Sequence, residues 1–343
     1  MRRPFVLLAA LLVAATTTAC GGSDSGGDTA GSTGAAGAAF PVTLEHKYGS
    51  TTVPASPKKV VTVGLTEQDA LLALGVVPVA TTEWLGGYPG AIGPWAQSTL
   101  NGATLPEVLK DTGGGPQFER IAALKPDLIL ALYSGITQEQ YQTLTEIAPT
   151  VAQPKEFKDY GVPWQEITKR VGKAVGKGAE AEKLVADVEA KFATAKQQNP
   201  GFQGATALMV TPYEGYFVYG RQDARSRVLT DLGFTLPSEL DQVVGDAFGA
   251  GISGERTDML DVDALVWIVA DLKDAPARLH QDRLYAPLDV VTQGREVFIP
   301  ESTEYGHATS FVSALSLPYL LEKLVPQLAA AVDGNASTAV PAS

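Results

Sequence analysis

Residues 119–130 read ERIAALKPDLIL, and residues 255–266, ERTDMLDVDALV, align on them without a gap. Both stretches follow the pattern E-R-x-x-x-L-x-x-D-x-[IL]-[LV], in which a helical segment leads into a short buried strand. One copy lies in each half of the chain. The repeat therefore predicts two lobes of the same topology, each with a strand covered by helices.

Strand-like and helical segments alternate on both sides of each copy. Runs rich in β-branched and aliphatic residues occur at 58–64, 127–132, 205–211 and 264–270. Helical patterns separate these runs, and such alternation is typical of parallel sheets with helices on both faces. The predicted fold class is α/β, with two parallel-sheet lobes.

A long segment rich in helix formers separates the two halves. Residues 163–199 are charged and amphipathic and contain no proline after position 163, so they predict one connecting helix of roughly 50 Å. We expect an N-terminal lobe over residues 41–162, this rigid helix, and a C-terminal lobe over residues 200–333. Residues 334–343 have the composition of a disordered tail.

The N-terminus predicts export and a lipid anchor. Two arginines precede an apolar run at residues 5–15, which is too short to cross a hydrocarbon core of roughly 30 Å. We therefore expect a signal peptide at residues 1–19 and acylation of Cys20, the single cysteine, which ends a lipobox-like sequence. Thr17 stands where a lipobox usually has Leu, so secretion with a free thiol is the alternative. The Gly- and Ser-rich stretch up to residue 40 predicts a flexible tether to the extracytoplasmic face of the cell membrane.

Composition excludes several functions for this chain of 343 residues. The net charge of −12, with 26 basic and 38 acidic side chains, argues against nucleic-acid binding. One cysteine permits no intrachain disulfide, and three scattered histidines predict no metal site. We also find no nucleophile elbow, phosphate-binding loop or zinc-protease motif, so no catalytic residue is predicted and the chain is not expected to be an enzyme.

Aromatic and basic residues follow several predicted strands. The carboxyl ends of parallel strands are where α/β proteins collect ligands. Rings with polar tips suit a large amphipathic guest, and arginine adds charge-assisted hydrogen bonds to oxygen-rich groups. Each of these residues could instead serve ordinary packing. The candidate ligand-binding residues are Trp84, Tyr88, Tyr133, Tyr213, Tyr219, Arg221, Arg225 and Tyr305, with Trp84, Tyr219, Arg221 and Tyr305 the leading four.

An ordered set of motifs resembles the iron-siderophore and vitamin B12 family of ABC-importer binding proteins. It comprises residues 59–64, 69–76, 119–130, 252–255 and 316–319. The resemblance implies two α/β lobes joined by one long helix. It also implies a monomeric receptor that passes a ferric siderophore to a permease dimer with its ATPase. The siderophore fills the iron coordination shell, so no protein metal ligand or cofactor is implied. Cobalamin or heme as the guest, or a surface interaction protein that transports nothing, remain alternatives.

Glu119 and Glu255 are the first residues of the two repeat copies. Their position alone is explained by the favourable interaction of an acidic side chain with the N-terminus of a helix, worth about 0.3–1 kcal/mol. The resemblance adds a second role, because members of the family present one surface glutamate per lobe to arginine pockets of the permease. It implies that Glu119 and Glu255 are these docking residues.

Overall fold

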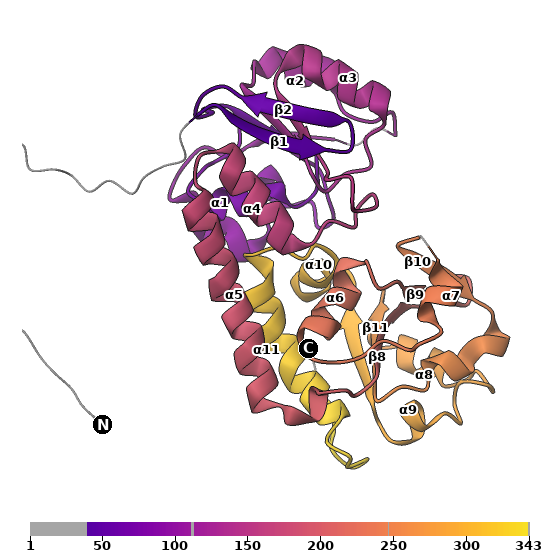
Figure 1. The fold of residues 1–343 in the computed structure, drawn as a ribbon. Helices are drawn as coiled ribbons and strands as arrows, with labels where there is room; N and C mark the ends of the chain where they lie inside the picture. The colour runs from indigo at the N-terminus through magenta and orange to yellow at the C-terminus, as the bar shows by residue number, and fades with distance from the viewer. Residues whose placement is uncertain (1–39, 111–112, 246, 342–343) are drawn as a thin grey trace, which may run out of the picture. The chain divides into compact units, whose positions relative to one another are not determined.

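The computed structural model describes residues 40–110, 113–245 and 247–341 (Figure 1). The predicted signal peptide, the acylated Cys20 and the tether up to residue 39 lie outside these residues. Within the described part of the chain, no helix combines the length and apolar character needed to cross a membrane.

The N-terminal lobe contains a five-stranded parallel sheet in the order β5-β4-β3-β6-β7. A β-hairpin that the sequence analysis did not predict pairs β1 with β2 and contacts β7. The strands are β1 (Val42–His46), β2 (Gly49–Val53), β3 (Val60–Thr62), β4 (Ala80–Thr82), β5 (Glu107–Leu109), β6 (Leu128–Ala131) and β7 (Thr150–Ala152). The helices are α1 (Glu67–Ala73), η1 (Pro89–Ala91), η2 (Pro94–Leu100), α2 (Phe118–Leu124) and α3 (Gln138–Ile147).

The C-terminal lobe contains a second five-stranded sheet, in the order β10-β9-β8-β11-β12. Its strands are β8 (Ala207–Thr211), β9 (Tyr216–Tyr219), β10 (Gly249–Ile252), β11 (Ala264–Val269) and β12 (Glu296–Pro300). Its helices are η3 (Pro200–Phe202), α6 (Ala224–Asp231), α7 (Leu240–Val244), η4 (Gly254–Leu260), α8 (Ala275–Leu279), α9 (Asp289–Thr292), α10 (Glu304–Ser310) and α11 (Ser316–Ala331).

The expectation of a wholly parallel sheet is wrong for this second lobe. Strands β8, β11 and β12 are parallel, but β9 is antiparallel to β8, and β10 is antiparallel to β9. Only residues 212–215 connect β8 to β9, and a parallel pair would need a crossover of about a dozen residues or more. Glu214 and Gly215 adopt positive φ values of 47° and 107° in this short turn. The α/β two-lobe class is confirmed, with one parallel and one mixed sheet.

The sequence repeat occupies equivalent places in the two lobes. The first copy forms α2 and leads into β6, and the second forms the 3-10 helix η4 and leads into β11. Both β6 and β11 are the fourth strand in the order of their sheet. The prediction of a shared helix-to-strand unit is therefore confirmed.

The single connecting helix predicted over residues 163–199 is wrong, because the segment forms α4 (Trp164–Ala174) and α5 (Gly178–Gln198). Gly176 adopts φ 74°, and Lys177 N–H donates to the Gly172 carbonyl at 2.7 Å. This left-handed glycine ends α4 without any proline. Helix α4 packs against α1 and β1 of the N-terminal lobe, so only α5, of 21 residues and about 32 Å, runs on toward the second lobe beside α11 (Figure 1).

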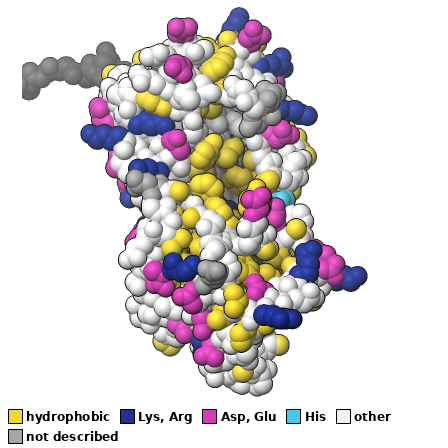
Figure 2. All heavy atoms as spheres, turned by 90° about the vertical axis from the view of Figure 1, so that its right-hand side faces the viewer, with side chains coloured by type: hydrophobic (Ala, Val, Ile, Leu, Met, Phe, Trp, Pro, Cys, Tyr) yellow, Lys and Arg dark blue, Asp and Glu magenta, His cyan; other side chains and the backbone are white. Residues whose placement is uncertain are grey.

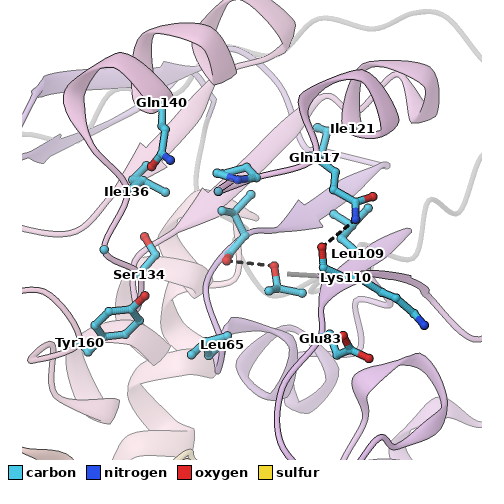
Figure 3. A pocket seen from close by; sticks show the side chains of 15 residues that line it. Leu65, Glu83, Leu109, Lys110, Gln117, Ile121, Ser134, Ile136, Gln140 and Tyr160 are labelled. Carbon is cyan, nitrogen blue, oxygen red and sulfur yellow. Dashed lines mark hydrogen bonds between the residues drawn. The ribbon is translucent and has the colours of Figure 1, made fainter. Parts of the chain in front are cut away.

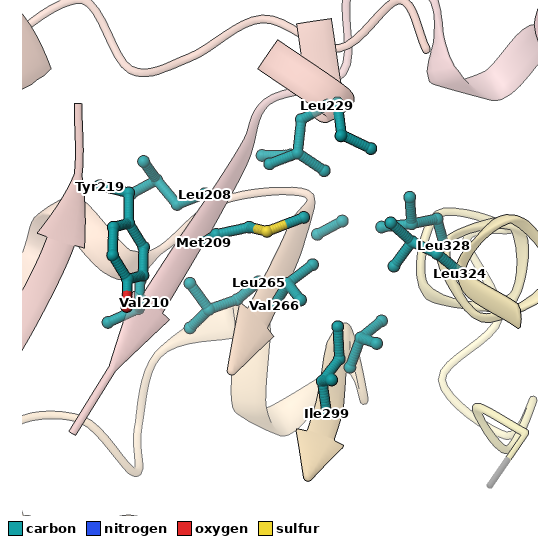
Figure 4. Packing of buried hydrophobic residues seen from close by; sticks show 14 of the residues in the cluster. Leu208, Met209, Val210, Tyr219, Leu229, Leu265, Val266, Ile299, Leu324 and Leu328 are labelled. Atoms are coloured by element: carbon teal, nitrogen blue, oxygen red, sulfur yellow. The ribbon is translucent and has the colours of Figure 1, made fainter. Parts of the chain in front are cut away.

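The C-terminal lobe has the largest apolar cluster, which Figure 4 shows from close by. Met209, Leu265 and Ile299 project from β8, β11 and β12, and Leu229 of α6 and Leu328 of α11 pack around them. The chain end also joins this lobe. The Pro341 carbonyl accepts a hydrogen bond of 2.8 Å from the Gln327 side chain, and Val340 packs against the cluster. The disordered tail expected from residue 334 is thus wrong as far as residue 341.

Candidate ligand-binding cleft

A hollow of about 400 Å³, here called the cleft, is lined by residues of both lobes. Most of its lining comes from segments that follow β3, β4 and β6 in one lobe and β8, β9 and β12 in the other. The carboxyl ends of the parallel strands in both lobes therefore meet here, where α/β proteins collect ligands, and the antiparallel β9 adds Tyr219, its last residue. The view turned toward this side shows hydrophobic side chains gathered in its hollowed middle, with acidic side chains beside them (Figure 2). The lining residues are Leu65, Leu85, Tyr133, Tyr160, Thr211, Tyr219, Asp223, Arg225, Phe248, Ile268, Glu301, Ser310 and Phe311.

One wall of the cleft is a stack built on Asp223. Its carboxylate caps α6 by accepting the Arg225 N–H at 2.9 Å, and it also accepts two hydrogen bonds of 2.8 Å from Nε and Nη2 of the Arg225 guanidinium. The guanidinium carbon lies 3.8 Å from the centre of the Tyr219 ring, whose hydroxyl lies 2.8 Å from Thr211 Oγ1. Burial lowers the pKa of Arg225, but the neighbouring Asp223 carboxylate raises that pKa by more, so the net shift is upward. Arg225 is a permanent cation held in one orientation.

The opposite wall depends on a buried carboxylate, Glu67. Its Oε1 accepts the backbone N–H groups of Leu132 at 2.5 Å and Tyr133 at 2.9 Å, which fixes the segment that carries the Tyr133 ring into the cleft. Burial raises the pKa of Glu67 and also raises that of the Tyr133 phenol. A Cβ on Gly64 would lie 2.0 Å from Glu67 Oε1, so only glycine permits this approach.

A second hollow of about 550 Å³, here called the side hollow, shares Leu85 and Glu301 with the cleft. The Tyr88 hydroxyl lies 2.7 Å from His307 Nδ1, which joins the two lobes here. Burial lowers the pKa of His307, although Glu301 and Glu304 raise it, and this net shift favours the neutral imidazole, whose Nδ1 can accept the phenol proton. The side hollow therefore extends the cleft along a hydrogen-bonded contact between the lobes.

A third hollow, of about 230 Å³, lies inside the N-terminal lobe and shares Leu65 and Tyr160 with the cleft. In Figure 3 its polar groups, among them Gln117 and Gln140, surround an apolar floor. Gln117 Nε2 donates to the Lys110 carbonyl at 2.7 Å. This N-lobe hollow continues the cleft toward α2 and α3.

Four of the eight predicted ligand residues line these hollows. Tyr133, Tyr219 and Arg225 line the cleft, and Tyr88 lines the side hollow. They come from both lobes and follow or end different strands.

Two predicted residues are buried behind the hollows. The Trp84 ring packs 4.8 Å from that of Phe311, and its Nε1 donates to the Ala91 carbonyl at 2.6 Å. Tyr305 points into the C-terminal lobe, where its hydroxyl donates to Gln327 at 2.6 Å. Neither side chain is part of the lining.

The other two predicted residues lie on the surface of the C-terminal lobe. The side chain of Arg221 pairs with Asp241, with Nε–Oδ2 3.1 Å, and is about half exposed. Tyr213, 64% exposed, stands in the turn between β8 and β9. The basic residue presented to the cleft is Arg225 on α6, because the chain turns at Gly220 before that helix begins.

Several lining residues were not predicted from the sequence. The rule of carboxyl strand ends points to Leu65 after β3 and to Glu301 after β12, so these two could have been found. Asp223 carried a signal as well, since an N-cap residue two positions before an arginine can pair with it. Phe248 precedes β10, a strand that the sequence analysis did not predict, and no pattern marked it.

The two proposed docking glutamates occupy matching places. Glu119 is the second residue of α2 and is exposed, and Glu255 is the second residue of η4. Among the described residues, no three His, Cys, Asp or Glu side chains are grouped so that they could hold a metal ion.

The sequence profile described as periplasmic binding protein matches residues 60–303. This chain belongs to the periplasmic binding protein family. YhfQ of Bacillus subtilis strain 168, named as an ABC transporter substrate-binding lipoprotein, is 28% identical over 266 residues, which are 74% of this chain and 79% of YhfQ. A periplasmic solute-binding protein of Mycobacterium smegmatis has 38% identity and a TM-score of 0.74, covering 85% of this chain and 98% of its own. PiaA of Streptococcus pneumoniae TIGR4, solved with ferrichrome, has 27% identity and a TM-score of 0.76, covering 85% and 99%.

Proposed function

We propose that this periplasmic binding protein captures a ferric siderophore in the cleft and delivers it to the permease of an ABC importer. The observation that supports this most directly is the cleft, where carboxyl strand ends of both lobes present aromatic rings and one oriented arginine. Its relative PiaA has been solved with ferrichrome, which is a guest of this kind.

The side chains of the cleft suit an oxygen-rich, partly apolar guest. Tyr133 and Tyr219 bring aromatic rings to the lining from opposite lobes, and Arg225 offers a charge-assisted donor to the oxygens around ferric iron. In the proposal the siderophore supplies all iron ligands, and the lining provides aromatic, aliphatic, hydroxyl and charged groups around it. Tyr88 adds a phenol at the side hollow.

Delivery would use the equivalent repeat units of the two lobes. Glu119 and Glu255 begin equivalent units, and α5 joins the lobes that carry them. In the proposal both glutamates dock to arginines of the permease dimer, and Cys20, acylated, holds a monomeric receptor at the extracytoplasmic face of the membrane. YhfQ is named as such a lipoprotein.

The experiment is a titration of tryptophan fluorescence with ferric siderophores, cobalamin and heme. Trp84 packs against Phe311 of the cleft lining, so a bound guest with a strong visible chromophore should quench it. Saturable quenching by at least one ferric siderophore, and weaker or absent quenching by cobalamin and heme, is the expected result. Tight binding of cobalamin or heme alone would identify that compound as the ligand in place of a ferric siderophore. No binding of any of these compounds would refute the receptor role.

A further inference from the structure

The charged side chains that line the cleft and the side hollow are mostly acidic. Among the described residues that line these two hollows, Arg225 is the only lysine or arginine, whereas three are acidic: Asp223, Glu301 and Glu304. His307 is buried, and burial lowers its pKa. The N-lobe hollow adds Glu83 and Lys110, which have opposite signs.

Arg225 contributes little net positive potential to a guest. Both Nε and Nη2 already donate to Asp223, and the side chains of Arg225 and Asp223 are only 16% and 3% exposed. The pair has no net charge, so it adds a local dipole and no net positive charge to the cleft. The Tyr219 ring covers one face of the guanidinium.

Glu301 and Glu304 are not compensated in this way. Glu301 directly follows β12, and Glu304 is the first residue of α10. Both residues are exposed and line the side hollow. Within the described part of the chain, neither forms an ion pair with a lysine or arginine. The negative potential of these two carboxylates therefore extends over the side hollow and over the part of the cleft that Glu301 lines.

Ferric siderophores differ in charge according to their iron-binding groups. Three hydroxamates neutralise ferric iron, and an additional amine makes the complex cationic, whereas three catecholates or two citrates leave it strongly anionic. Resting on the function proposed above, we infer that this receptor selects neutral or cationic ferric hydroxamates and rejects anionic ferric complexes. Glu301 and Glu304 provide the rejection, and they can also pair with an ammonium group on the guest.

Binding of four ferric complexes to the purified full-length protein tests this selection. Ferrichrome is neutral, ferrioxamine B is cationic, and ferric dicitrate and ferric enterobactin are anionic. We expect the two hydroxamates to bind at least about tenfold more tightly than either anion at low salt, and the difference to shrink as salt screens the exposed carboxylates. Equal or tighter binding of an anionic complex would overturn the selectivity while leaving the receptor role intact. Absence of binding by all four would instead remove the proposed function itself.

A double variant that removes the charges of Glu301 and Glu304 tests whether these two residues produce the selectivity. The double variant Glu301→Gln, Glu304→Gln should raise the affinity for ferric dicitrate about threefold or more and change that for ferrichrome by less than about twofold. The matched control Glu180→Gln, Glu322→Gln removes two exposed carboxylates from α5 and α11, away from the cleft, and should change neither affinity. Unchanged ratios in the first double variant, or the same shift in the control, would show that Glu301 and Glu304 do not set the selectivity.

Discussion

The Asp223–Arg225 pair forms one wall of the cleft, and its removal should be strongly non-additive. Arg225→Met keeps the length of the side chain but leaves the Asp223 carboxylate, 3% exposed, without its cation. Breaking a buried pair in this way costs about 3–5 kcal/mol of folding free energy, and the 16% exposure of Arg225 places this one near the lower end. Loss of the contact with the Tyr219 ring at 3.8 Å adds about 1 kcal/mol.

The second single variant of this double-mutant cycle removes the charge of Asp223 and keeps its role as the N-cap of α6. Asp223→Ser can still accept the N–H of residue 225 at the start of α6, so the expected loss of about 2 kcal/mol comes from the unpaired guanidinium. In the double variant neither charge remains buried, and we expect a total loss of only about 1 kcal/mol. The summed losses of the single variants therefore exceed that of the double variant by about 5 kcal/mol, which is the expected coupling of the pair.

Urea unfolding followed by circular dichroism measures this cycle, with the m-value compared among the four proteins to show that they unfold alike. If the losses of the two single variants add up to that of the double variant within about 0.5 kcal/mol, the pair does not hold this wall together.

Three further predictions concern the ligand, pH and the permease. Arg225→Ala should weaken ferrichrome binding by about 1.5–3 kcal/mol. Arg221→Ala, which removes an exposed pair with an aspartate, should leave the ferrichrome affinity unchanged. A larger loss of affinity in Arg221→Ala than in Arg225→Ala would place the guest elsewhere. Burial raises the pKa of Asp69, so its contribution to stability is complete below about pH 4 and declines as pH rises through the elevated pKa. Asp69→Asn should therefore make the urea midpoint of unfolding depend less on pH between about pH 4 and pH 7. An unaltered pH profile would contradict this. The double variant Glu119→Arg, Glu255→Arg should abolish siderophore-dependent growth under iron limitation with ligand affinity and melting temperature retained, because like charges would then face each other at the permease. Normal growth of that variant would leave the two glutamates only their role at helix ends.

Local patterns in the sequence were sufficient for the two-lobe plan. The copies at residues 119–130 and 255–266 have the same spacing of helix, aspartate and strand, and they form equivalent units in the two sheets. This succeeds because a covered parallel strand and the helix before it each have a recognisable composition over a few residues. The same regularity placed Tyr133 and Tyr219 at strand ends, where they line the cleft.

What the tertiary structure alone decided depends on contacts between residues far apart in the chain. Arg221 and Arg225 follow the same strand, and only the turn at Gly220 and the cap at Asp223 determine which guanidinium faces the cleft. The break between α4 and α5 occurs at Gly176, which has a left-handed backbone, and no proline marks it in the sequence. Helix α4 packs on the N-terminal lobe, which separates its course from that of α5. Glu67 is an acidic residue in the first turn of α1, a place where such residues are usually exposed, yet it is fully buried and fixes Tyr133 through a backbone N–H of a distant segment. Side-chain direction and burial are properties of the packed fold, and no local pattern encodes them.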